Sequence, residues 1–460
     1  MDNFKNNLFR FSCILFGVLF VGCDLITDQT PWVTLFDGSS LEGWSQKGGE
    51  AKYTVSDGEI IGTTVHDTPN SFLVTDSIYG DFILELEFLV DPSMNSGIQI
   101  RSESLPYYQN GRVHGYQVEI DPSERAWSAG IYDEARRGWL HPLDDQNKSA
   151  KSAFKQNQWN HYRIEAIGDT IKTWINGDEA AHLMDDQTDK GFIGLQVHSI
   201  GQNQEEGTEI RWRNIKILTE NIEAYSTKTS LPMLDKINKL TKNELDSGWQ
   251  MLWDGETTNG WRGAKLEAFP ENGWEIKNSE LIVLASDGGE SEAGGDIVTL
   301  KKYSDFEFMV DFKLTPGANS GIKYYVDTNI NKGAGSSIGL EYQILDDDLH
   351  PDAKLGNHPG SRTLASLYDL IQADVDKPTK AIGEWNRAHI ISKDNNVKHY
   401  LNGAKVLEYE RMTVQFRTLV SESKYVVWPN FGELEEGQIL LQDHGDLVHF
   451  KNIKIKELTN

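Results

Sequence analysis

The sequence feature that most constrains the fold is an internal repeat that runs through almost the whole chain. Segments of the first half return in the same order in the second half, and the matching pairs are residues 35–44 and 252–261, 79–88 and 303–312, 95–98 and 319–322, 174–177 and 400–403, 194–198 and 440–444, and 212–217 and 450–455. The spacing between matching residues grows along the chain, which indicates the same strand order with longer loops in the second copy. This period is far longer than the roughly 20–50 residues of solenoid repeats. The chain is therefore predicted to contain one domain in two copies.

Each copy has the residue pattern of short antiparallel strands. Residues 82–89, 162–167 and 171–175 place apolar residues in alternation with polar ones, as half-buried strands do. Asn-Gly pairs at 176–177 and 402–403 suit the positive φ angles of tight hairpin turns. Long stretches of helical periodicity are nearly absent. The sequence therefore predicts an all-β fold with two β-sandwich domains in tandem.

The segment between the copies, residues 221–247, is polar and rich in lysine. Apolar residues recur in it at the spacing of a helix, and these are Leu231, Leu234, Ile237 and Leu240. A linker with one short helix is therefore predicted there. The first sandwich is then expected at residues 31–220 and the second at residues 248–460.

The N-terminus has the pattern of an export signal. Lys5 and Arg10 precede an apolar run that is too short to span a bilayer and is typical of a signal peptide. Residues 20–23, Phe-Val-Gly-Cys, resemble a lipobox, whose cysteine is lipidated when the signal is removed. We therefore expect a lipoprotein signal peptide at residues 1–22 and an exported protein, lipid-anchored through Cys23 to the cell envelope, in the periplasm or at the outer membrane. Ordinary secretory cleavage nearby is the alternative.

Cysteine content and charge exclude several classes of function. The chain has two cysteines, Cys13 and Cys23, so a mature chain that begins at Cys23 has no disulfide framework, zinc–thiolate cluster or catalytic thiol. The formal net charge of −26 repels phosphate backbones. Nucleic acid is therefore not an expected partner.

In the first copy, polar residues at alternating strand positions predict a site. Gln99 and Arg101 follow an Asn-Ser-Gly-Ile motif and are expected to project together. Further polar residues share one face of a strand or lie close to it in sequence, and these are Gln117, Glu119, Asp121, Tyr132, Arg137, Trp139, Gln196 and His198. A turn, a solvent-exposed strand face or a structural histidine would explain the same patterns without a site.

The second copy carries different residues at corresponding places. Gln442 and His444 match the Gln-x-His pair of the first copy, while the polar strand and its continuation contribute Glu341, Gln343, Asp346, Asp347, His350 and Tyr368. Carboxylates and imidazoles are common metal ligands. A divalent metal ion in the second domain is therefore a hypothesis, with Asp346, Asp347 and His350 as its ligands.

At these motifs the sequence resembles the 3-keto-disaccharide hydrolase domain family of bacterial exported proteins. The resemblance covers both copies nearly end to end and rests on Leu-Phe-Asp-Gly…Gly-Trp, Asn-Ser-Gly-Ile, Gly-Tyr-Gln-Val-Glu-Ile-Asp, Glu-Tyr-Gln-Ile-Leu-Asp, Trp-Asn and Leu-Gln-Asp-His. It implies a laminin-G-like, concanavalin-A-like jelly roll and a carbohydrate substrate, a glycoside oxidised at carbon 3. The first copy has Leu-Gln-Val-His, so the role of Asp443 cannot be carried over to it.

The chemistry of such a substrate suggests roles for these residues. A ketone at C3 acidifies the hydrogen at C2, so a base can remove it and the C1 substituent leaves, after which water adds to the enone. The reaction needs a base, a donor to the enolate oxygen and an acid. We expect the base in His198 or His444, the acid in Glu119 or Glu341, and the donor in Arg101 or the metal ion. Substrate binding is expected from Gln99, Gln117, Asp121, Tyr132, Arg137, Trp139, Gln343, Tyr368 and Gln442.

The leading interpretation is an enzyme that cleaves 3-keto-glycosides, as a hydrolase or as a lyase followed by hydration. The main alternative is a non-catalytic carbohydrate-binding or adhesion module with Trp127, Trp139 and Trp428 as stacking platforms. A purely structural surface protein is a third interpretation. An enzyme should gather its histidine, arginine and acidic groups in one concave pocket, whereas a binding module should present a flatter groove with exposed aromatic residues.

Overall fold

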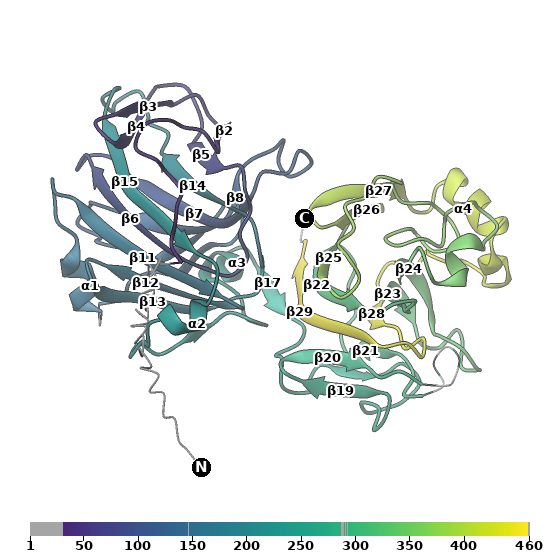
Figure 1. Cartoon of the computed structure of the whole chain (residues 1–460). Helices are drawn as coiled ribbons and strands as arrows, with labels where there is room; N and C mark the ends of the chain where they lie inside the picture. The colour runs from purple at the N-terminus through teal and green to yellow at the C-terminus, as the bar shows by residue number, and fades with distance from the viewer. Residues whose placement is uncertain (1–30, 146, 287–288, 290, 292, 459–460) are drawn as a thin grey trace, which may run out of the picture.

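The computed structural model describes residues 31–458 apart from 146, 287–288, 290 and 292. The predicted signal peptide and Cys23 lie outside the described residues. In the described part of the chain, no helix is long and apolar enough to cross a membrane. Antiparallel strands dominate both halves of the molecule, which lie side by side in Figure 1. The all-β fold expected from the sequence is therefore confirmed.

The first half is a sandwich of two sheets. The first sheet contains β1 (Val33–Thr34), β3 (Lys52–Ser56), β4 (Glu59–Thr63), β6 (Phe82–Val90), β11 (Asn160–Ile167), β12 (Thr170–Ile175), β13 (Asp178–Met184), β15 (Glu209–Leu218) and β16 (Leu234–Asp235). Its order is β16-β13-β12-β11-β6-β15-β4-β3, with β1 beside β15. The second sheet contains β2 (Trp44–Gly48), β5 (Ser71–Thr75), β7 (Ser96–Glu103), β8 (His114–Ile120), β9 (Ile131–Glu134), β10 (Gly138–His141) and β14 (Phe192–Val197). Its order is β10-β9-β8-β7-β14-β5-β2.

Apolar side chains at alternate positions of both sheets form one core in this half. The core includes Phe82, Leu84, Leu86 and Phe88 of β6 and Tyr116, Val118 and Ile120 of β8. The polar residues between the core positions of β8 are also buried, so this strand is covered on both faces. The outer face of the second sheet therefore carries polar side chains that are shielded from solvent.

The second half repeats this arrangement. Its first sheet contains β17 (Trp249–Met251), β19 (Trp274–Lys277), β20 (Glu280–Val283), β22 (Phe306–Leu314), β25 (Trp385–Lys393), β26 (Asn396–Leu401), β27 (Ala404–Glu410) and β29 (Val448–Glu457). The order is β19-β20-β29-β22-β25-β26-β27, with β17 beside β29. The other sheet contains β18 (Trp261–Gly263), β21 (Ile297–Thr299), β23 (Asn319–Asp327), β24 (Ile338–Leu345) and β28 (Gln438–Leu441), in the order β18-β21-β28-β23-β24.

Helices are short and lie between strands. They are α1 (Lys148–Ala153), α2 (Ile222–Tyr225), α3 (Lys242–Asp246), α4 (Val414–Ser421), and the 3-10 helices η1 (Pro351–Lys354) and η2 (Lys424–Val427). The helix expected from Leu231 to Leu240 does not form. Leu234 instead pairs in parallel with Leu183 of β13, because strand pairing satisfies backbone groups that so short a helix would hold only marginally.

Polar contacts join the two halves. Lys451 and Asn452 of β29 donate hydrogen bonds to Asp186, which follows β13. Arg387 of β25 donates to the side-chain oxygen of Gln187 at 2.5 Å. At the edge of this contact, Lys190 pairs with Glu384 at 2.9 Å. The segment that follows β13 in the first half therefore contacts β25, the residue before it, and β29 of the second half.

Candidate active site

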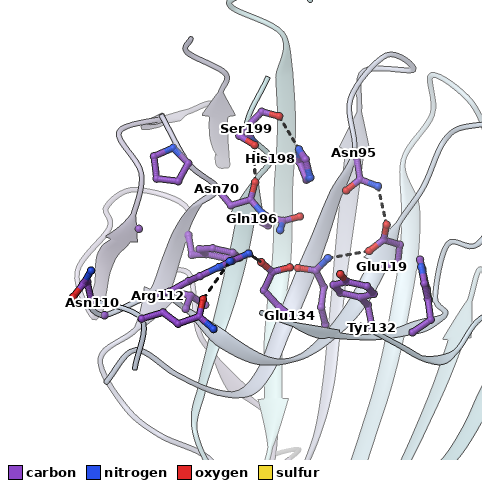
Figure 2. Close-up of a pocket in the computed structure, with 18 of the residues that line it drawn as sticks. Asn70, Asn95, Asn110, Arg112, Glu119, Tyr132, Glu134, Gln196, His198 and Ser199 are labelled. Atoms are coloured by element: carbon purple, nitrogen blue, oxygen red, sulfur yellow. Dashed lines mark hydrogen bonds and ion pairs between the residues drawn. The ribbon is translucent and has the colours of Figure 1, made fainter. Parts of the chain in front are cut away.

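A cleft of about 890 Å³ opens on the outer face of the second sheet of the first half (Figure 2). Its floor carries side chains of β8, β9 and β14 that point away from the core, and these are Gln117, Glu119, Tyr132, Glu134 and Gln196. Loops around the floor add Asn70, Asn95, Arg112 and His198. Strand pairing thus gathers polar residues that are far apart in the sequence into one concave pocket.

The Asn-Ser-Gly-Ile motif shapes this floor through Gly97. Gly97 lies opposite Glu119 in the pairing of β7 with β8. A Cβ atom at Gly97 would stand 2.4 Å from the side-chain amide carbon of Gln117, so glycine leaves the space that this side chain fills. Gln117 donates to Oε2 of Glu119 at 2.9 Å and accepts from Gln99 at 2.6 Å. The motif therefore positions an amide beside a buried carboxyl group.

Glu119 is a buried carboxyl group, with 4% of its surface exposed. Burial raises its pKa to about 7, against the opposing effect of hydrogen bonds from Asn95 and Gln117 and of the positive charge of Arg125. The Asn95 amide donates to Oε1 at 2.7 Å, and the Arg125 guanidinium lies 3.4 Å from the same oxygen. A carboxyl group with a pKa near neutrality is suited to donate a proton.

His198 follows β14 at the wall of the cleft and is half-buried. Its Nδ1 lies 2.7 Å from the carbonyl oxygen of Ser199, and because a carbonyl only accepts, Nδ1 carries the proton of the neutral ring. Nε2 is then the unprotonated nitrogen, and it has no hydrogen-bond partner among the residues that the structure describes. The Ser199 amide in turn donates to Asn70 at 2.9 Å, which holds this turn in place. His198 therefore offers a base to the cleft.

Gln196 is an amide on the floor whose hydrogen bonds are not satisfied within the described chain. Its side chain is fully buried, and neither Nε2 nor Oε1 has a partner among the described residues. A buried polar group left unpaired costs about 1–3 kcal/mol. A polar ligand in the cleft would supply the missing partners.

Charged and aromatic side chains complete the rim. Burial raises the pKa of Glu134, while Arg112, 3.5 Å from its Oε1, acts in the opposite direction. Trp139 packs edge-on against Tyr132, with ring centroids 5.2 Å apart. Arg125 lies over the Trp139 ring at 5.1 Å. This wall combines an apolar surface with positive charge, as sugar-binding sites often do.

The cleft brings together most of the first-copy residues that the sequence singled out: Gln117, Glu119, Tyr132, Trp139, Gln196 and His198. Gln99 lies beneath the floor and reaches it only through Gln117. Asp121 accepts hydrogen bonds from Arg125 at 2.7 Å and from the Trp127 amide at 3.2 Å, so it supports the rim.

Arg101 and Arg137 lie away from the cleft. Arg101 has a φ of 46°, and the pairing of β7 with β8 shifts register at this point, so its side chain leaves the face of Gln99. Its guanidinium donates to the carbonyls of Gly80 and Gly168 and to Asp81. Strict alternation fails here because an irregularity in the ladder redirects the side chain. The position of Arg101 therefore does not suit the enolate role expected for it.

Arg137 has a structural position near the contact between the halves. It pairs with Asp133 at 2.6 Å and with Asp185 at 2.8 Å. Its backbone carbonyl oxygen accepts a hydrogen bond from the hydroxyl of Thr241, the residue that precedes α3.

The cleft also contains residues that the sequence analysis did not predict, and these are Asn70, Asn95 and Arg112. Of these, Asn95 carried a signal, since it opens the repeated Asn-Ser-Gly motif.

The second half has the same strand positions with different side chains. Gly321 lies opposite Gln343, and Lys323 opposite Glu341. By register, the equivalent pairs are Glu119 and Gln343, Gln117 and Glu341, and Gln99 and Lys323. Glu341 is paired with Lys323, 3.5 Å from its Oε2, and Gln343 has a buried amide with no partner among the described residues. Gln442 lies next to β23, since its backbone N–H donates to the carbonyl oxygen of Gly321.

The ligand set expected for a metal ion is not brought together. Asp346 accepts the backbone N–H groups of Gly317, Asp348 and Leu349, and Asp347 accepts the Leu364 amide and pairs with Lys377. Both carboxylates therefore hold turns. His350 lies instead beside His444 and Asp446, and Tyr368 donates to Asp352 at 2.7 Å.

Comparison with known proteins identifies the family. The model of the 3-keto-alpha-glucoside-1,2-lyase-like domain matches residues 31–218 and 248–456. A 3-keto-disaccharide hydrolase of Bacteroides thetaiotaomicron is 39% identical over 231 residues, which cover 46% of this chain and 79% of that protein. Two solved structures of candidate glycosyl hydrolases from Parabacteroides distasonis are 29% and 28% identical, over 49% and 44% of this chain and 100% of each of those chains, with TM-scores of 0.43 and 0.30. The resemblance seen in the sequence is thus confirmed, and the chain belongs, through both of its halves, to the 3-keto-α-glucoside-1,2-lyase-like family of glycoside-cleaving enzymes.

Proposed function

We propose that this protein cleaves glycosides oxidised at carbon 3 and that the cleft of the first half is its active site. The observation that carries the proposal is the presence, in one cleft, of an unprotonated imidazole nitrogen on His198 and a buried carboxyl, Glu119, with a pKa of about 7. An elimination needs such a base and such an acid. The family and the Bacteroides relative support the substrate class.

The reaction follows from the acidity of the C2 hydrogen beside a C3 ketone. Nε2 of His198 takes the C2 proton, and the electron pair of that bond forms the enolate. The enolate then collapses to a C1–C2 double bond as the C1–O bond breaks, and Glu119 gives its proton to the departing oxygen. Water adds to C1 of the enone and gives a proton to Glu119, while His198 returns a proton to C2. The net result is hydrolysis.

Gln196 is suited to stabilise the enolate. Negative charge develops on the C3 oxygen, and a preorganised N–H donor in a buried site stabilises such charge strongly. The unpaired Nε2 of Gln196 is such a donor on the cleft floor. The ring of Trp139, with Arg125 above it, offers a surface for the sugar or its C1 substituent.

An isotope experiment tests this proposal. The full chain is incubated in D2O with a 3-keto-glucoside and with the matching unoxidised glucoside, and the products are followed by NMR. We expect cleavage of the keto substrate alone, with deuterium at C2 of the product beyond the exchange of 3-keto-glucose without protein. Cleavage of the unoxidised glucoside at a similar rate would contradict the mechanism. Sugar binding without cleavage of either would favour the carbohydrate-binding alternative.

A histidine variant with a matched control locates the site. His198→Ala should lower kcat by about 10²–10⁴, the usual contribution of a general base. His161→Ala is the control, because this half-exposed histidine sits beside Glu85 on the opposite sheet. Equal activity of the two variants would place the reaction elsewhere.

Export and anchoring through Cys23 are a separate proposal, supported by the N-terminal sequence pattern. Metabolic labelling with a radioactive fatty acid should mark the wild-type protein and not Cys23→Ser. Labelling of the variant, or a soluble unlabelled wild-type protein, would contradict the anchor.

A further inference from the structure

A cluster of ligand-type side chains lies in the second half, away from the cleft just described. We propose that His350, His444 and Asp446 form a divalent-cation site. One donor atom of each residue lies within 4.8 Å of the other two, and the two imidazole rings stand nearly perpendicular with centroids 5.9 Å apart. Donor atoms held about 2.0–2.2 Å from one ion are roughly 3–4 Å apart, so small side-chain rotations would close the set around an ion.

The backbone holds the three side chains in place. His444 and Asp446 lie on the turn between β28 and β29, on either side of Gly445, whose φ of 85° lets the chain reverse between them. Oδ2 of Asp446 accepts the backbone N–H of Asn319 at 3.0 Å. The other carboxylate oxygen of Asp446, Oδ1, has no partner among the described residues. His350 precedes η1, and its Nδ1 accepts the backbone N–H of Asp352 at 3.2 Å, which fixes the ring at the start of this helix.

Unpaired buried atoms beside the cluster provide a second, independent sign of a ligand. Asn319 is 2% exposed and its backbone N–H donates to Asp446, yet its side-chain Oδ1 has no partner among the described residues. Gln343 pairs with Gly321, two residues along β23 from Asn319; it is 1% exposed, and neither end of its side-chain amide is paired within the described chain. Buried polar atoms are almost always hydrogen-bonded in native proteins. A ligand at this corner would satisfy them.

The site is a property of the second half alone. His198 is the first-half equivalent of His444, but the residue two places beyond it is Ile200, which cannot bind a metal. Among the residues that the structure describes, no other group of three histidine, cysteine or acidic side chains meets in this way. The two halves have therefore acquired different chemistry at one strand end.

The ligand set indicates the class of ion. Two imidazole nitrogens and one carboxylate oxygen suit Zn²⁺ or Co²⁺ rather than Mg²⁺ or Ca²⁺, which prefer oxygen. Three protein ligands leave a coordination position open. Hydroxyl or ketone oxygens of a sugar are the ligands that the neighbouring amides, Asn319 and Gln343, would help to orient there.

Metal binding by the full chain tests this site without recourse to activity. The chain is stripped with chelator and titrated with Zn²⁺ by calorimetry, and with Co²⁺ while its visible absorption is recorded. We expect one tightly bound ion per chain and a visible Co²⁺ spectrum typical of a coordination site of low symmetry. His444→Ala should abolish both signals. Asp446→Asn keeps an acceptor for the backbone N–H of Asn319. It should weaken metal binding at least tenfold while the circular dichroism spectrum stays unchanged.

His198→Ala is the matched control, because it removes the equivalent histidine of the first half and should leave metal binding unchanged. Absence of a tight site in the wild-type chain would overturn the proposal. So would binding that survives in both His444→Ala and Asp446→Asn, which would indicate an adventitious ion only. The ion would bind whether or not the first half cleaves 3-keto-glycosides, so failure of one proposal leaves the other standing.

Discussion

The two halves of this protein share their strand order, but the polar faces of the equivalent strands β8 and β24 differ in charge. In the first half a buried carboxyl, Glu119, is surrounded mainly by amides, and its pKa rises to about 7. In the second half the equivalent position is Gln343, and the nearby carboxyl Glu341 lies against the ammonium group of Lys323. The inward residues of both strands remain apolar. Duplication thus preserved the core, because packing constrains it, while the outward face was free to change.

This difference in charge between the two strand faces indicates which half is suited to proton transfer. A carboxyl group that titrates near neutrality can give up and regain a proton during a reaction. Glu341 instead forms an ion pair with the buried ammonium group of Lys323, an arrangement suited to structure or binding. Our two proposals accordingly assign the elimination chemistry to the first half and metal binding to the second. The following experiments would break or sharpen this comparison.

The largest effect is expected from Glu119→Gln. Loss of the acid should lower kcat by about 10²–10⁴. In the wild-type protein Glu119 must be protonated to act, so activity should fall as pH rises through about 7. This alkaline limb of the pH profile should be absent from the residual activity of the variant. The measurement is kcat/KM against pH. Glu87→Gln, on the opposite sheet and paired with Arg213, is the control. A persistent limb in Glu119→Gln would assign the titration to another group.

Removing the cation of the second half should cost more stability than removing its first-half equivalent. Lys323→Met takes the ammonium group away from buried Glu341 and Asp296, a loss of about 3–5 kcal/mol. Gln99→Met removes hydrogen bonds to Gln117 and Ser102 at an expected cost of about 1–3 kcal/mol. Denaturant unfolding of both variants measures the difference. Equal losses would show that the two strand faces are electrostatically alike after all.

The stability of the first half should depend on pH through Glu119. Its folded pKa of about 7 lies above the usual 4.5, so the folded state binds this proton more tightly than the unfolded state. The contribution to stability is complete below pH 4.5 and is lost as pH rises through about 7, by about 3 kcal/mol in total. Unfolding of the wild type and of Glu119→Gln at both ends of this range measures the loss. A pH dependence that is unchanged in the variant would refute the raised pKa.

The smallest effect is expected at the rim of the contact between the halves. Lys190 and Glu384 pair at 2.9 Å, but their side chains are 50% and 36% exposed. Exposed pairs contribute about 0–1 kcal/mol, less at high salt. Lys190→Ala should therefore shift the thermal unfolding temperature only slightly. A shift as large as that of Lys323→Met would mean that the halves depend on this pair to stay together.

Sequence patterns predicted the parts of the site that lie on straight strands. Gln117, Glu119 and His198 were found because alternation along a strand records which side chains share a face. The same rule misplaced Arg101, because the ladder of β7 and β8 shifts register beside it. The Tyr-Gln pairs at 116–117 and 342–343 look alike in the sequence, but the pairing partners place Gln117 opposite Gln99 and Glu341 opposite Lys323, so Gln117 is equivalent to Glu341. Register depends on both partners of a pair and cannot be read from one strand.

The amino-acid sequence by itself determined the duplication, the all-β fold and the family, because these depend on local periodicity and on repeated motifs. Only the tertiary structure decided which groups meet in the cleft. Asn70 and Arg112 reach it from loops, and Asp346 and Asp347, which look like metal ligands in the sequence, are occupied by backbone N–H groups and Lys377. A raised pKa or a shared ligand position depends on burial and distance. Both are set by how distant segments pack, which no local pattern records.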